Sequence, residues 1–197
     1  MNYEELTELL LQSLEHEKGG VQVYETALRC VLNDDLRTEW EEYLDQTRNH
    51  VQILQTVCER LEIDTDQLTP GCEVVRHLGS ALVQAMTMAI DAGNREAAQL
   101  VACECVVLAE TKDHADWELL TKCAEELSGD KAKVLEAACE EVEDEEDEHL
   151  YHSKGWCREL WLQSLGLKAV LPPPEERKDV KTAIGAARAQ QASERSR

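Results

Sequence analysis

Residues 131–165, KAKVLEAACEEVEDEEDEHLYHSKGWCRELWLQSL, decide the fold of this chain. Side chains three and four positions apart in this stretch fall on one face of an α-helix. That face consists of Leu135, Ala138, Val142, Glu146, His149, Ser153, Trp156 and Leu160. The two ends of the stripe are apolar and its middle is acidic and basic. The stretch therefore predicts a long helix that buries Glu146 and His149 halfway along its length.

The same periodicity extends over most of the chain and predicts an all-α protein. Four further helices are expected over residues 2–32, 35–62, 73–91 and 95–127. Short polar corners join the first helix to the second and the fourth to the last, which makes each pair antiparallel. The connection between the pairs is long and carries the helix at 73–91. This layout predicts an antiparallel four-helix bundle with a long crossover that carries an extra helix, the connectivity of ferritin-like folds.

Domain limits follow from a change of composition after the last helix. We expect residues 1–168 to form the bundle, and residues 169–197 to form a Pro-rich stop and a flexible C-terminal tail. Within the tail, residues 182–188 (TAIGAAR) resemble the short peptides that load ferritin-like cargo into bacterial encapsulin shells. The alternative is a disordered tail with no such partner.

Composition excludes several classes of function. With 197 residues, only 4% aromatics and a net charge of −21, the chain is unsuited to nucleic acid or to an anionic membrane surface. No apolar run is long enough to span a membrane, and the acidic N-terminal sequence MNYEELTELL is unlike a signal peptide. We therefore expect a cytoplasmic protein. Its eight Cys residues are interpreted as buried small hydrophobic residues in a reducing compartment.

Polar residues interrupt the apolar stripe of every long helix near its middle. The interruptions are Glu17 on the first helix, Thr47 and His50 on the second, Glu110 and Asp113 on the fourth, and Glu146 and His149 on the last. Glu17 and His50 lie equally far from the first corner, and Glu110 and His149 lie equally far from the second. Equal offsets in an antiparallel pair mean equal height. The sequence thus predicts one interior layer of carboxylate and imidazole groups.

Such a layer needs compensation, because unpaired buried carboxylates are costly and repel one another. Bound cations would remove both problems, and oxygen and imidazole donors suit iron or manganese. The predicted metal ligands are Glu17, His50, Glu110, Asp113, Glu146 and His149. The alternative is a metal-free polar layer held by hydrogen bonds and shifted pKa values.

These residues give the chain a resemblance to the ferritin-like di-iron proteins, the group that contains bacterioferritins and rubrerythrins. Over residues 2–165 it looks closest to small bacterial ferritin-like stress proteins. The resemblance rests on Glu17 with Tyr24 seven residues later, on Glu110, and on the Glu146-x-x-His149 motif. It implies two iron ions, or manganese, and redox chemistry with oxygen or peroxide. Tyr24 is then a candidate catalytic residue with a redox or hydrogen-bonding role; the alternative is a core aromatic residue.

The chain departs from the family pattern on the second helix. The family pattern has Glu-x-x-His there, whereas this chain has Thr47-x-x-His50, so one bridging carboxylate is missing. Asp113, Glu145 or His114 are candidates to compensate. A single ion or an asymmetric pair therefore stays open beside the symmetric di-iron site.

Other readings of the sequence stay open. The second functional hypothesis is a manganese catalase-like enzyme that disproportionates peroxide, and the third is a metal-free stress or interaction module. The acidic run at residues 140–149 is either a solvated helix face or a cation entry route. Cys30, Leu9 and Leu11 lie off the main stripe of the first helix and suggest a second apolar face, hence a homodimer.

Overall fold

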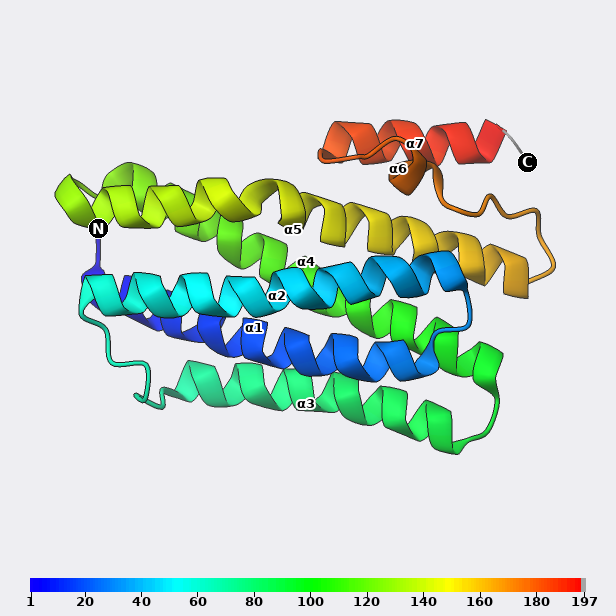
Figure 1. The fold of residues 1–197 in the computed structure, drawn as a ribbon, viewed down its shortest axis with the longest axis horizontal. Helices are drawn as coiled ribbons and strands as arrows, with labels where there is room; N and C mark the ends of the chain where they lie inside the picture. The colour runs from blue at the N-terminus through cyan, green and yellow to red at the C-terminus, as the bar shows by residue number, and fades with distance from the viewer. Residues whose placement is uncertain (196–197) are drawn as a thin grey trace.

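The computed structural model describes residues 1–195, and this part of the chain is entirely helical apart from its connections. Four long helices lie side by side (Figure 1): α1 (Tyr3–Cys30), α2 (Asp34–Leu61), α4 (Arg95–Glu126) and α5 (Gly129–Ser164). Helix α1 packs against α2 and α4, and α5 packs against the same two helices, so the four form a closed ring. The expected all-α class is confirmed.

The corners and caps agree with the sequence to within a few residues. Asn2, Asn33 and Asn94 each accept a backbone N–H bond at the start of α1, α2 and α4. Helix α3 (Pro70–Asp91) begins three residues before its predicted start, because Thr69 caps it and Pro70 fits the first helical turn. None of the helices in residues 1–195 combines the length and the apolar character needed to cross a bilayer.

The predicted stripes form the interior of the ring. Every stripe position on α5 is buried, from Leu135 to Leu160, and so is every stripe position on α2, from Trp40 to Leu61. The apolar residues separate into two clusters. Trp40 and Trp156 belong to one cluster, toward the α1–α2 corner. The other lies toward the opposite end, and the polar side chains occupy the level between them.

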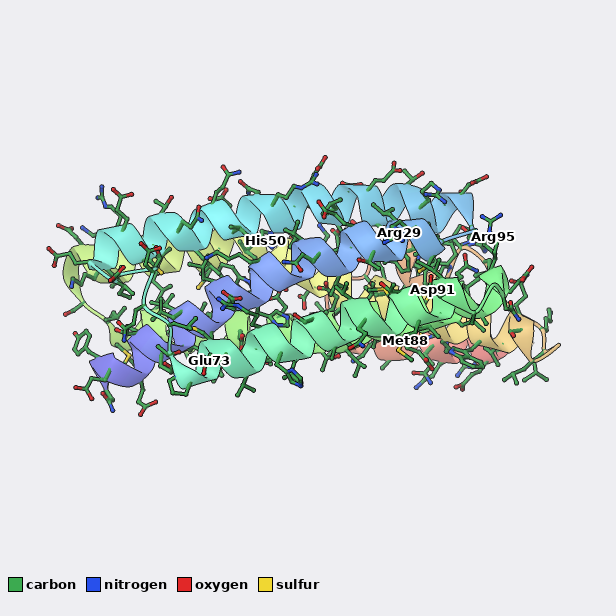
Figure 2. The ribbon with its side chains drawn as sticks, turned by 90° about the horizontal axis from the view of Figure 1, so that it is seen from below. Arg29, His50, Glu73, Met88, Asp91 and Arg95 are labelled. Atoms are coloured by element: carbon green, nitrogen blue, oxygen red, sulfur yellow. The ribbon has the colours of Figure 1, made fainter. Side chains whose placement is uncertain are left out.

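Helix α3 lies outside the ring and covers α1 and α4. Figure 2 shows it running alongside α1, with the exposed Met88 on its surface. The two helices approach closely at Gly19 and Gly79, where a side chain on Gly79 would begin 3.7 Å from the Gly19 Cα. Leu11 and Cys30 are each only 3% exposed within the single chain, and Leu9 is half-buried against one of the apolar clusters. The second apolar face of α1 is thus covered intramolecularly, and it gives no support to a dimer.

The C-terminal segment differs from the expected flexible tail. Helices α6 (Pro174–Arg177) and α7 (Ala183–Arg195) fold back against α5 (Figure 1). The fully buried carboxylate of Glu159 accepts bonds from Ser193 Oγ at 2.6 Å and from the Val170 N–H at 2.9 Å. These bonds, and the burial of Ala189, dock the segment on α5. The encapsulin-like stretch at 182–188 includes the start of α7, with Ile184 exposed.

Candidate metal centre

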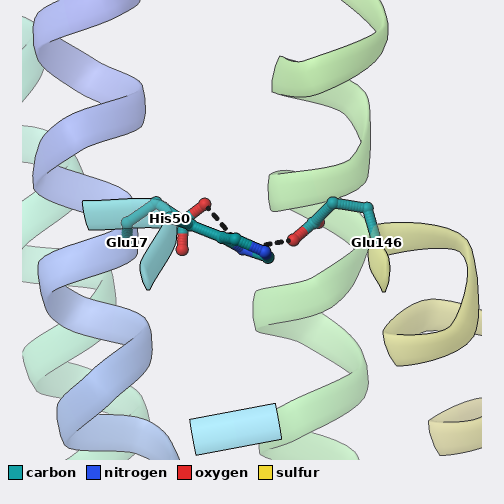
Figure 3. Close-up of side chains that lie close together, drawn as sticks. All are labelled: Glu17, His50 and Glu146. Carbon is teal, nitrogen blue, oxygen red and sulfur yellow. Dashed lines mark ion pairs between the residues drawn. The ribbon is translucent and has the colours of Figure 1, made fainter. Parts of the chain in front are cut away.

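One group of potential ligands joins α1, α2 and α5. His50 lies between the carboxylates of Glu17 and Glu146 (Figure 3). Its Nδ1 is 3.4 Å from Glu17 Oε1 and 3.1 Å from Glu146 Oε1. All three side chains are at least 98% buried. The pairing of Glu17 with His50, which was predicted from equal distances to the corner, is confirmed.

A second group joins α4 and α5 and shares Glu146 with the first. His149 Nδ1 is 3.5 Å from Glu110 Oε2 and 3.7 Å from Glu146 Oε1. In each group, the ligand atoms lie within 4.8 Å of one another, and all members are buried. The two imidazole rings are stacked with centroids 5.8 Å apart. Glu146 therefore stands between two sets of donors, each of which could hold a cation.

Both imidazoles are oriented by their outer nitrogen atoms. His50 Nε2 donates to Glu145 Oε2 at 2.7 Å, and His149 Nε2 donates to Gln46 Oε1 at 2.8 Å. In the neutral imidazole, the proton on Nε2 leaves a lone pair on Nδ1, which faces the carboxylates in both cases. Metal-binding histidines are held in this way, with the second ring nitrogen bonded to a carboxylate or an amide oxygen.

Several atoms of the layer have no hydrogen-bond partner among residues 1–195. They are Glu17 Oε2, Tyr24 Oη, His50 Nδ1, Glu110 Oε2, Asp113 Oδ1 and both carboxylate oxygens of Glu146. Buried polar atoms are normally bonded, because each unmade bond costs about 1–3 kcal/mol and more for a charged group. With both imidazoles neutral, the Nδ1 lone pairs face carboxylate oxygens. This arrangement fits a shared cation better than a network of hydrogen bonds, and carboxylate and imidazole donors fit iron or manganese.

Burial and crowding shift the pKa values of the layer. Burial, together with the charge of Glu17, raises the pKa of Glu146 to about 7. Burial and the neighbouring carboxylates likewise raise the pKa of Asp113. Burial alone would lower the pKa of His50, but the carboxylates around it raise it well above its usual value. Without a cation, the layer therefore holds protons that metal ions would displace.

Two other predicted residues lie in the layer but outside both groups. Asp113 is 4% exposed, yet it belongs to neither three-residue group. Tyr24 is fully buried, and its ring is 6.1 Å from that of His149 in an edge-to-face arrangement. Burial and the Glu110 carboxylate raise the pKa of the Tyr24 hydroxyl. Its phenol is thus neutral beside the second group.

Neither Thr47, which stands at the position of the missing carboxylate, nor the suggested replacements His114 and Glu145 belong to the two groups of potential ligands. Thr47 is buried, but its hydroxyl donates to the Tyr43 carbonyl one turn earlier at 2.7 Å. His114 Nε2 lies 2.9 Å from Asp147 Oδ1, outside the layer. Glu145 contacts the outer side of His50, so it orients a potential ligand and is not itself one.

Several residues around the layer were not predicted from the sequence. Trp117 Nε1 donates to Glu17 Oε1 at 2.9 Å, and its place on the stripe one turn after Asp113 could have suggested this bond. Tyr43 packs on His149 with ring centroids 4.1 Å apart. Its hydroxyl donates to Glu39 Oε1 at 2.6 Å and lies 3.1 Å from His152 Nδ1. Glu39 lies off the predicted stripe, and periodicity gave no signal for it.

Comparisons with known proteins add no relative. No protein-family model, no curated protein and no solved structure matches the chain. The assignment of a function therefore depends on the geometry of the layer.

Proposed function

We propose that this chain is a ferritin-like four-helix protein that binds two iron or manganese ions and uses them in redox chemistry with oxygen or peroxide. The observation that carries the proposal is the shared carboxylate of Glu146, which lies between a Glu17–His50 pair and a Glu110–His149 pair. Two pairs of donors around one shared carboxylate could hold an adjacent pair of cations, with one carboxylate fewer than the di-iron pattern has.

The charge of the layer is one that divalent cations could balance. Four acidic side chains (Glu17, Glu110, Asp113 and Glu146) are each at most 4% exposed. Protonation of both imidazoles would balance only two of these charges, so a metal-free layer must also hold protons on Glu146 and Asp113, in line with their raised pKa values. Two divalent ions would neutralise the four carboxylates and leave the imidazoles as neutral donors.

Each residue has a defined task in the proposal. Glu17 and His50 would hold one ion, Glu110 and His149 would hold the other, and Glu146 could serve both. The two sets of ligands would be unequal to the family pattern, because Thr47 offers no second shared carboxylate. The bound ions would supply the electrons for the reduction of oxygen or peroxide. The buried phenol of Tyr24 lies beside the Glu110–His149 pair, within reach of a redox or proton-transfer role.

Apolar side chains shield the layer from water on the sides that face the two apolar clusters. Leu14, Leu54 and Val106 are each no more than 1% exposed, and they pack next to the layer from the two apolar clusters. A dry surrounding strengthens the attraction between carboxylates and cations and limits the escape of reactive species.

The experiment is metal reconstitution followed by elemental analysis. The chelated protein is incubated with Mn²⁺, or with Fe²⁺ under argon, and freed of unbound ions. We expect about two ions per chain in the wild type, and a loss of at least one in Glu146→Gln. The matched control is Glu141→Gln, which neutralises an exposed acid on the same helix and is expected to keep both ions.

Activity is measured on the same samples. Oxidation of Fe²⁺ by oxygen, followed by absorbance, is expected in the wild type and in Glu141→Gln but not in Glu146→Gln. Evolution of oxygen from peroxide by the Mn²⁺ form would favour a catalase-like reaction. Equal metal content in Glu146→Gln and the wild type, or no bound metal in either, would reject the proposal.

A further inference from the structure

A pocket of about 590 Å³ between α4 and α5 reaches one of the proposed metal ligands. Glu146 and Trp117 line its inner part, and both are at least 96% buried. Neither carboxylate oxygen of Glu146 has a hydrogen-bond partner among the described residues. Trp117 donates to Glu17, the carboxylate on the other side of His50. The inner end of this pocket is therefore the polar layer itself.

The outer part of the pocket is acidic. Glu118, Glu143 and Asp147 line it, with the Glu118 side chain 72% exposed and the Asp147 side chain 19% exposed. Lys122 also lines the pocket, but its ammonium group is paired with Glu125 at 2.9 Å. The carboxylates thus become less exposed from Glu118 through Asp147 to Glu146. His114 also lines the pocket, with its Nε2 2.9 Å from Asp147 Oδ1, so the Asp147 carboxylate is shared with an imidazole. A cleft in which charge of one sign dominates raises the local concentration of the opposite ion.

The C-terminal segment forms part of the rim. Thr182 and Ala183, where α7 begins, line the pocket. They are held there by Lys181, whose Nζ lies 2.7 Å from Glu148 Oε1 and 3.3 Å from Asp144 Oδ2 on α5. The rim therefore places Thr182 and Ala183, which carry no charge, at the mouth of the pocket. The ammonium group of Lys181 is paired on the neighbouring surface of α5.

From these observations we propose that divalent cations enter the centre through this pocket, with Glu143 and Asp147 as transit carboxylates and Glu146 as the first ligand reached. This inference rests on the proposed function. A transit group can be recognised from kinetics. It changes the barrier that a cation crosses on entry and exit but not the energy of the bound state. Its removal therefore changes the rate constants of loading and release by the same factor and leaves the dissociation constant unchanged.

The test is stopped-flow loading of the full-length, chelated protein with Co²⁺, followed by its visible absorbance, together with release into excess chelator. We expect Glu143→Gln with Asp147→Asn to slow loading and release about 10-fold each, with unchanged stoichiometry and dissociation constant. Glu143→Gln alone, at an exposed position, is expected to show a smaller slowing of both rates. Added salt is expected to slow the wild type more than the double variant, because it screens exposed carboxylates. Glu141→Gln, outside the pocket, is the matched control.

Three results would overturn the proposal in distinguishable ways. Unchanged rates in the double variant would place the entrance elsewhere. A loss of affinity or stoichiometry would make Glu143 or Asp147 a ligand and not a transit group. If the wild type binds no Co²⁺, Mn²⁺ or Fe²⁺ at all, the proposed function itself fails, and the entry route fails with it.

Discussion

His50 shows how a single residue is prepared for metal binding. Its Nδ1 faces two buried carboxylates and its Nε2 is bonded to Glu145, whose side chain is 34% exposed. The bond from His50 lowers the pKa of Glu145, which keeps this outer carboxylate charged. A charged acceptor fixes the tautomer and makes Nδ1 a better donor to a cation.

We predict that Glu145→Ala weakens metal binding without removing a ligand. The expected loss is about 10- to 100-fold in affinity for Mn²⁺, because His50 loses the partner that orients it. Titration against a competing chelator would measure it. Glu141→Ala removes an acid from the exposed face of the same helix and is the control. An unchanged affinity in a normally folded Glu145→Ala protein would show that the bond is dispensable.

The residues of the layer were predictable to the extent that they occupy stripe positions. Glu17, Glu110 and Glu146 stand where a 3.6-residue period requires an apolar side chain, so each violation was visible in the sequence. Glu145 and Gln46 lie beside the stripe and reach inward on long side chains. The helical period therefore does not predict that they contact the layer. Thr47 was also visible as a violation, but its hydroxyl bonds within its own helix.

At the scale of the helices, the short connections determine the height at which each residue of the layer lies. Because both corners are short, counting residues from them placed Glu17 opposite His50 and Glu110 opposite His149. The docking of α6 and α7 could not be found in this way. It depends on Glu159, which is fully buried, and on Arg158, which donates two bonds to Glu175 at 2.8 and 2.9 Å. In the sequence these residues look like ordinary surface charges.

We predict that Gly155→Ala releases the C-terminal segment from α5. A methyl group at this position would lie 2.7 Å from Glu175 Oε2 and 2.9 Å from Pro173 Cβ, and Arg158 holds Glu175 in place. Alanine itself favours the helix by up to about 1 kcal/mol, so α5 should persist.

Limited proteolysis would detect this release as faster cleavage within residues 169–195, while the helical circular dichroism of the bundle is retained. Lys154→Ala, at the exposed neighbouring position on α5, is the control and is expected to cleave at the wild-type rate. Equal cleavage of both variants would show that the segment accommodates the methyl group without undocking.

At the scale of the whole molecule, the polar layer divides the apolar interior into two clusters. In a chain with a net charge of −21, the layer adds buried acidic groups to an already acidic body. Folding without metal must therefore take up protons at the centre. The stability of the whole protein is thereby linked to pH and to metal.

The direction of that link can be derived from the shifted groups. The pKa of Glu146 rises from its ordinary 4.5 to about 7 on folding, mainly through burial, so the folded chain binds the extra proton between these values. Stability from this proton is lost as pH rises across that window. His50 and His149 act in the same direction, because their raised pKa values add stability that is lost as pH rises above 6.5. The pKa of Glu110 is lowered, so its contribution to stability has the opposite pH dependence. That contribution is lost only as pH falls below about 4.5.

We therefore predict that the chelated protein loses a few kcal/mol of unfolding free energy between about pH 5 and pH 8, measured by urea denaturation at constant ionic strength. Repulsion among the surface carboxylates also grows with pH and lowers the stability of every variant. The test is therefore the difference in slope between Glu146→Gln and the other proteins. Glu146→Gln should show a shallower fall, and Glu141→Gln the full one. Saturating Mn²⁺ should flatten or reverse the dependence, because the ions replace the protons. A chelated wild type and Glu146→Gln with the same slope would mean that the centre takes up no proton at Glu146 on folding.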